Sequence, residues 1–243
     1  MKTRHSLPGQ DLANAAVLEQ EERYNYLWRL KIGYIPYSYS PIRKRVPDIS
    51  NVDIPGQLPL PKPSWDEIRN KISKDCYNPE GVAANLQVAD GFKLFCEENS
   101  VFGSPTSFLP FQVGFFDIGF QASIKYWHDI IISVSGRPII PFIDTRKSGT
   151  LTREGRRFVF SVMHERIRLA FPDFQDVGLS VIQFENVKSG PRSANLLTDD
   201  GYELYDYATL NAMITDTYKM WWMVQNERQK AERQKPTGTG FLF

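Results

Sequence analysis

The chain has 243 residues, a formal net charge of +1, 42% hydrophobic residues and 23% charged residues. These values are typical of a folded globular protein and exclude a chain that is disordered throughout. The small net charge also excludes a uniformly basic protein, so any nucleic-acid contact would need a local basic patch.

The cysteine and histidine contents limit the metal and redox chemistry that the chain can carry. Cys76 and Cys96 are the two cysteines, they form no C-x-x-C pair, and the chain has three histidines. This pattern excludes a disulfide framework and argues against a structural zinc site. We expect no signal peptide and no membrane span, because no apolar run of the required length occurs. The predicted location is the cytoplasm.

The N-terminal part of the chain is predicted to be a helix followed by an extended arm. Apolar residues recur at helical spacing over residues 11–33. Seven of the 16 prolines fall in residues 34–63, and proline fixes φ and removes a hydrogen-bond donor. We therefore expect this proline-rich arm, which includes the basic cluster Arg43-Lys44-Arg45, to be neither helix nor central strand. Its interleaved apolar residues predict that it lies on a surface, either of its own domain or of a partner.

The chain then divides into a mixed α/β domain over residues 64–234 and a flexible tail over 235–243, with residues 1–63 as an N-terminal appendage. Ser64 and Glu67 form a capping-box pattern that predicts the start of a short helix. The further expected elements are a helix at about 80–98, a strand at 111–120, a hairpin at 123–146, a helix at 151–170, strands at 178–185 and near 192–199, and a final helix at 206–234.

The hairpin carries the most specific geometric prediction. If Gly136 and Arg137 form a two-residue turn, Ser135 pairs with Pro138 and Asp129 pairs with Asp144. Two carboxylates would then face each other across the hairpin, where like charges destabilise a sheet. Such a pair requires a bound cation, a shared proton or a nearby arginine, and Arg146 lies two residues beyond Asp144 on the same face.

The order of these elements, α-β-β-β-α-β, together with Asp129 and the Asp144-x-Arg146 sequence, resembles the core of the PD-(D/E)XK nucleases. The resemblance covers residues 80–185. It implies a central mixed sheet flanked by helices, with Asp129, Asp144 and Glu98 as ligands of Mg²⁺ or Mn²⁺, and Glu97 is the alternative to Glu98. The candidate catalytic residues that it implies are Asp129, Asp144, Arg146, which stands where that family has lysine, and Lys147, which follows it.

The resemblance implies a metal-dependent nuclease, acting alone or within a multi-subunit defence or mobile-element complex. The metal would activate a water and neutralise charge on the phosphodiester. Arg153, Arg156 and Arg157 on the following helix would bind the nucleic acid. The alternative for these arginines is a solvated helix face with ion pairs, because Glu154 lies among them.

A second interpretation needs no catalysis. Asp129 and Asp144 are then an edge pair that faces solvent, or each binds an arginine. The protein would be a scaffold or adaptor that binds partner proteins, or a second copy of itself, through the proline-rich arm and the Gly-Phe-Leu-Phe end of residues 235–243. A small-molecule enzyme is a third class, for which the sequence shows no phosphate loop or nucleophile elbow.

Overall fold

A mixed sheet stands at the centre of the computed structural model, which describes residues 6–31, 38–50, 63–101, 107–108, 116–117 and 123–234. Its strand order is β1-β4-β5-β6-β7, with β5 and β6 parallel and the other neighbours antiparallel. A second ladder joins β2 to β3. The predicted mixed α/β fold is confirmed. The strands are β1 Ser107–Phe108, β2 Phe116–Asp117, β3 Ser123–Ile124, β4 Ile130–Val134, β5 Arg137–Asp144, β6 Gly178–Phe184 and β7 Ala194–Thr198.

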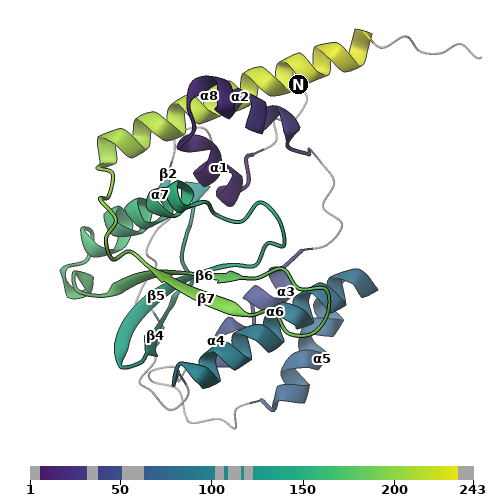
Figure 1. Cartoon of the computed structure of the whole chain (residues 1–243), viewed down its shortest axis with the longest axis vertical. Helices are drawn as coiled ribbons and strands as arrows, with labels where there is room; N and C mark the ends of the chain where they lie inside the picture. The colour runs from purple at the N-terminus through teal and green to yellow at the C-terminus, as the bar shows by residue number, and fades with distance from the viewer. Residues whose placement is uncertain are drawn as a thin grey trace, which may run out of the picture.

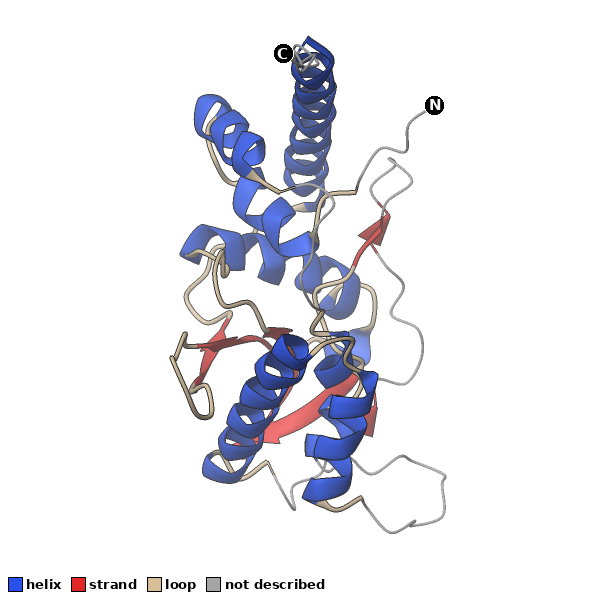
Figure 2. Cartoon of the chain, turned by 90° about the vertical axis from the view of Figure 1, so that its right-hand side faces the viewer, coloured by secondary structure: helices blue, strands red, loops and turns tan. Residues whose placement is uncertain are grey.

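Helices cover both faces of the sheet (Figure 1). One layer holds α1 Gly9–Ala16, α2 Gln20–Arg29, α7 Arg153–Met163 and α8 Tyr207–Gln234. The other holds α3 Ser40–Arg43, α4 Val46–Ser50, α5 Trp65–Asp75 and α6 Pro79–Glu98. Figure 2 shows that α8 lies at the end of the molecule opposite α5 and α6. A π-helical turn, His164–Arg168, and a short 3-10 helix, Pro172–Phe174, follow α7.

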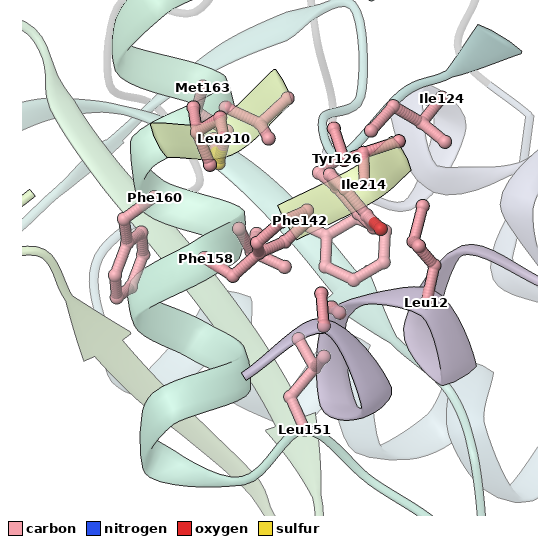
Figure 3. Close-up of a cluster of buried hydrophobic side chains, with 14 of the residues drawn as sticks. Leu12, Ile124, Tyr126, Phe142, Leu151, Phe158, Phe160, Met163, Leu210 and Ile214 are labelled. Atoms are coloured by element: carbon pink, nitrogen blue, oxygen red, sulfur yellow. The ribbon is translucent and has the colours of Figure 1, made fainter. Parts of the chain in front are cut away.

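Each face of the sheet has its own hydrophobic core, because side chains alternate along β5. Phe142 points to the first core, where the ring of Tyr126 meets it edge-on at 5.6 Å and meets Phe158 at 6.2 Å (Figure 3). Ile139 and Ile143 point to the second core, under α3 to α6. Burial on both faces explains why β5 is almost continuously apolar rather than alternating.

The predicted single helix over 11–33 is wrong, because two helices, α1 and α2, occupy this region. The Arg23 side chain stabilises the break. Its guanidinium donates hydrogen bonds to the carbonyls of Ala15, Ala16 and Leu18, at 3.1, 3.1 and 2.8 Å. Carbonyls at a helix end need such partners, so α1 can stop although the apolar pattern continues.

The arm at 34–63 is partly helical, which corrects the prediction that it contains no helix. Residues 38–50 form α3 and α4 and lie against α5 and α6, with Ile42, Val46 and Ile49 buried in the second core. The Ile42 N–H donates to the buried Asn85 side chain at 3.1 Å. Proline is compatible with the first turn of a helix, where its missing donor costs nothing. Residues 32–37 and 51–62 lie outside the described residues.

The hairpin of β4 and β5 is confirmed, but its predicted register is wrong. Ser133 pairs with Pro138 and Val134 pairs with Arg137, so every β4 residue pairs two positions nearer the turn than expected. Ser135 and Gly136 form the turn, with φ values of +50° and +83°. Two consecutive positive φ values characterise the turn that matches strand twist, and the predicted Gly136-Arg137 turn would not use Ser135 in this way.

Most of the remaining elements agree with the sequence predictions. The capping box of Ser64 and Glu67 is present at the start of α5, and α6, α7, β6, β7 and α8 lie where they were expected. Of the strand expected at 111–120, Phe116–Asp117 is described as strand and the other residues lie outside the described ranges. Residues 235–243 also lie outside them. Among the described helices, none is both long and apolar enough to cross a membrane.

Candidate functional site

The two aspartates that suggested an active site lie in different environments. Asp129 precedes β4, its side chain is 50% exposed, and it forms an ion pair with Lys125. Asp144 is the last residue of β5, is 0% exposed and pairs in the sheet with Gln183 of β6. The predicted face-to-face pair is therefore not formed, because it depended on the wrong hairpin register.

The Asp144 carboxylate holds the loop between β5 and α7. It accepts hydrogen bonds from the backbone N–H of Leu151 at 3.0 Å, the backbone N–H of Arg146 at 3.3 Å and the Gln183 side-chain amide at 3.3 Å. A buried carboxylate with three donors has compensation for the water that it has lost. These bonds fix the direction in which the chain enters α7.

Arg146 ties the same loop to the first helix of the chain. Its guanidinium forms a bidentate pair with Asp11 of α1, at 2.7 and 2.9 Å, and both side chains are largely shielded from solvent. The Tyr26 hydroxyl of α2 donates to the same carboxylate at 3.0 Å. Burial, followed by the charge of Asp11, raises the pKa of Tyr26 to about 12. Arg146 thus acts as a link between α1, α2 and the β5–α7 loop.

A residue that the sequence analysis did not single out completes this arrangement. Arg192 is 0% exposed, and its guanidinium donates to the carbonyls of Glu185, Thr145, Arg146 and Phe184 at 2.6 to 2.9 Å. No local pattern could have revealed it, because two of its acceptors, the carbonyls of Thr145 and Arg146, lie in a distant segment of the chain. We call Asp11, Asp144, Arg146, Gln183 and Arg192 the β5–α7 network.

Helix α6 passes directly over the backbone of Arg192. A Cβ at Gly91 would lie 1.9 Å from the Arg192 carbonyl oxygen, so only glycine fits here. The Arg192 N–H donates to the Gln87 carbonyl at 3.1 Å. The network therefore connects the α6 layer with the strands and the β5–α7 loop.

The remaining predicted metal and catalytic residues do not join Asp144. Glu98 is exposed at the end of α6, which packs on the opposite face of the sheet, and Lys147 is partly exposed in the β5–α7 loop. In the part of the chain that the structure describes, no three acidic, histidine or cysteine side chains lie close enough together to hold a metal ion. The predicted site of Asp129, Asp144 and Glu98 for Mg²⁺ or Mn²⁺ is therefore not assembled.

Two of the three arginines predicted to bind nucleic acid bond to the protein itself. Arg156 donates to the Leu151 carbonyl, the Gln183 side chain and the Tyr202 hydroxyl, at 3.0, 3.2 and 3.3 Å. Arg157 donates to the Glu203 carbonyl at 2.5 Å and lies 3.9 Å from the centre of the Tyr205 ring. Arg153 is exposed. These contacts fasten the segment before α8 to α7.

Comparison with known proteins gives a family match over most of the chain. Residues 10–231 match the family described as "SocB: Sliding clamp-binding bacterial toxin SocB". The chain is 31% identical, over 237 residues, to the DNA replication inhibitor toxin SocB of Caulobacter vibrioides (strain NA1000 / CB15N). The aligned region covers 98% of this chain and 96% of that relative. No solved structure gives a significant match.

These matches overturn the nuclease interpretation and the PD-(D/E)XK resemblance. That resemblance covered residues 80–185 and rested on a hairpin register that the structure does not have. The family match extends over almost the whole chain and is to clamp-binding toxins. The predictions of a hydrolase and a metal-binding protein are wrong, and the partner-binding alternative agrees better with the family.

Proposed function

We propose that this chain, which belongs to the SocB family of sliding clamp-binding bacterial toxins, binds the bacterial sliding clamp and thereby inhibits DNA replication. The observation that carries the proposal is the nearly full-length match to a toxin named for this inhibition. Because the proposed target takes part in DNA replication, we expect the protein to act in the bacterial cytoplasm.

The β5–α7 network supports binding rather than catalysis. Asp144 and Arg146, the two residues of the proposed catalytic set that lie in this network, bond to other parts of the protein. A catalytic group must reach its substrate, whereas the Asp144 carboxylate is fully buried. The network instead stabilises a rigid body from which a binding segment can be presented.

We assign the clamp contact to the proline-rich arm. Its described part is anchored, because Ile42, Val46 and Ile49 are buried between α5 and α6. Residues 51–62 follow this anchor directly and contain three prolines together with Ile54, Leu58 and Leu60. Proline-rich segments with apolar side chains are well suited to bind as extended peptides, because less conformational entropy is lost on binding.

The proposal is tested by measuring the affinity of the purified chain for the sliding clamp of its source bacterium by surface plasmon resonance. We expect saturable binding by the wild-type chain. The double variant Leu58→Ala/Leu60→Ala should bind at least about tenfold more weakly, as expected for apolar anchors at an interface. Leu94→Ala is the matched control, because Leu94 is 43% exposed on α6 and lies outside the arm.

Three outcomes separate the parts of the proposal. Absence of binding by the wild-type chain would refute the clamp as the partner. If the Leu58→Ala/Leu60→Ala variant binds with wild-type affinity, the clamp remains the partner but the arm is refuted as the contact. Expression of the wild-type chain in that bacterium should also lower the rate of DNA synthesis, and expression of the arm variant should not.

A further inference from the structure

A groove with an apolar floor runs between α2 and α8. Two adjoining cavities, of about 470 and about 320 Å³, share Gln20, Met220 and Met223 in their walls. Met223 is 43% exposed, and Met220 is partly buried against the first core. Methionine side chains are flexible and polarisable, so they adapt to inserted aromatic and aliphatic groups. We call this surface the α2–α8 groove.

The apolar surface continues from the groove along α2. Tyr24 lines one cavity and stacks on Trp28 with ring centres 5.8 Å apart, and Trp28 is 37% exposed. The Arg228 guanidinium of α8 lies 5.4 Å from the centre of the Trp28 ring. This row of side chains therefore leads from Met223 towards the C-terminal end of α8.

The charged side chains at the rim of the groove are three acids and two bases, a formal net charge of −1. Glu19, Glu21 and Asp216 line it, together with Lys219 and Arg23. Lys219 lies 3.8 Å from Asp216, and the Arg23 guanidinium donates to backbone carbonyls of the chain. An occupant that carries carboxylate side chains would be repelled, whereas a neutral or basic apolar segment would not.

The nine residues after α8 have this composition. They read KPTGTGFLF, with one lysine, no acidic residue and the apolar run Phe241-Leu242-Phe243. Met223 lies about 16 Å along the helix axis from Gln234, given a rise of about 1.5 Å per residue. Seven extended residues reach about 23 Å. Phe241 can therefore return to the groove without any change in α8.

We propose that residues 235–243 fold back along α8 and place Phe241, Leu242 and Phe243 in the α2–α8 groove of the same chain. The two apolar surfaces then shield each other from water, which stabilises both. The segment is thus an intramolecular element rather than the clamp contact. This inference is independent of the proposed function, because the described part of the arm, residues 38–50, and the groove belong to different layers of the fold.

The test uses the full chain labelled with ¹³C at the methionine methyl groups and recorded by NMR. It is compared with the variant Phe241→Ala/Leu242→Ala/Phe243→Ala. We expect the Met220 and Met223 methyl signals to move in this variant, because aromatic rings shift the resonances of methyl groups next to them. The Met163 signal is the control, because Met163 is 0% exposed in the first core and should not move. A chain that ends at residue 234 should give the same spectrum as the triple variant.

Two results would overturn the proposal. Unchanged Met220 and Met223 signals in both variants would show that the segment does not occupy the groove. A difference that grows with protein concentration would show that a second copy supplies the occupant. Clamp affinity should be the same for the full chain and for the chain that ends at residue 234, so failure of this inference and failure of the proposed function give distinguishable results.

Discussion

The β5–α7 network and the α2–α8 groove contrast in how fully the chain uses its own groups. In the network, the carboxylates of Asp144 and Asp11 and the guanidinium of Arg192 are bonded within the protein. Met223 in the groove and Trp28 on the adjoining surface of α2 keep more than a third of their surface exposed. The residues that resembled a catalytic site therefore have a structural role, while the exposed apolar side chains are the ones available for binding. Residue type alone did not distinguish these roles, whereas the burial of the side chains and their hydrogen bonds did.

The largest effect is expected when the buried guanidinium of Arg192 is removed. Arg192→Met removes a buried donor from four carbonyls and should lower the free energy of unfolding by about 3 to 5 kcal/mol. Urea denaturation followed by circular dichroism measures it. Arg153→Met is the matched control at an exposed position and should change stability by less than about 0.5 kcal/mol. Equal effects of the two substitutions would mean that Arg192 does not hold the network together.

The two aspartates provide a second, smaller contrast. Asp144→Asn weakens the bonds from the Leu151 and Arg146 N–H groups and should lower the free energy of unfolding by about 2 to 3 kcal/mol. Asp129→Asn removes an exposed ion pair with Lys125 and should cost less than about 1 kcal/mol. The same urea titrations measure both variants. If Asp129→Asn lowers the free energy of unfolding more than Asp144→Asn does, Asp129 rather than Asp144 is the aspartate that holds the fold.

A still smaller, pH-dependent effect is expected at Tyr26. Tyr26→Phe removes the bond to Asp11 and should cost about 1 kcal/mol at neutral pH. Because the folded pKa of about 12 lies above the ordinary value of 10.0, the unfolded chain loses this proton first as the pH rises. The stability that Tyr26 contributes is fully present below pH 10.0 and is lost as the pH approaches 12.

The difference in unfolding free energy between the wild type and Tyr26→Phe should therefore shrink over that window. Parallel urea titrations at pH 8 and at the highest pH where the fold persists measure this difference. A constant difference across the range would show that the Tyr26 hydroxyl titrates independently of folding.

The smallest effect is expected in the groove. In the chain that ends at residue 234, Met223→Gln replaces an exposed thioether by a polar group of similar length and should change the free energy of unfolding by about 0.5 kcal/mol or less. Thermal denaturation measures it against the same shortened chain that keeps Met223. A loss comparable to that of Asp144→Asn would place Met223 in the core and remove the contrast between the two regions.

Local rules predicted much of the fold. The capping box of Ser64 and Glu67 and the boundaries of α6 and β6 depend on neighbouring residues in the chain, and they were predicted correctly. The break between α1 and α2 was missed because the side chain of Arg23, not a helix-breaking residue, supplies donors to the carbonyls at the end of α1. The helices in the arm were missed because Ile42 and Val46 gain their stability by packing under α5 and α6.

The candidate site shows the same division. The turn chemistry of Ser135 and Gly136 decided the register, and a shift of two positions was enough to separate Asp129 from Asp144. By itself, the sequence determined the mixed α/β class, most element positions and the hairpin, because periodicity and capping act over a few residues. Only the tertiary structure decided that Asp144 and Arg146 are internal links, because Asp11, Gln183 and Arg192 approach them from distant parts of the chain.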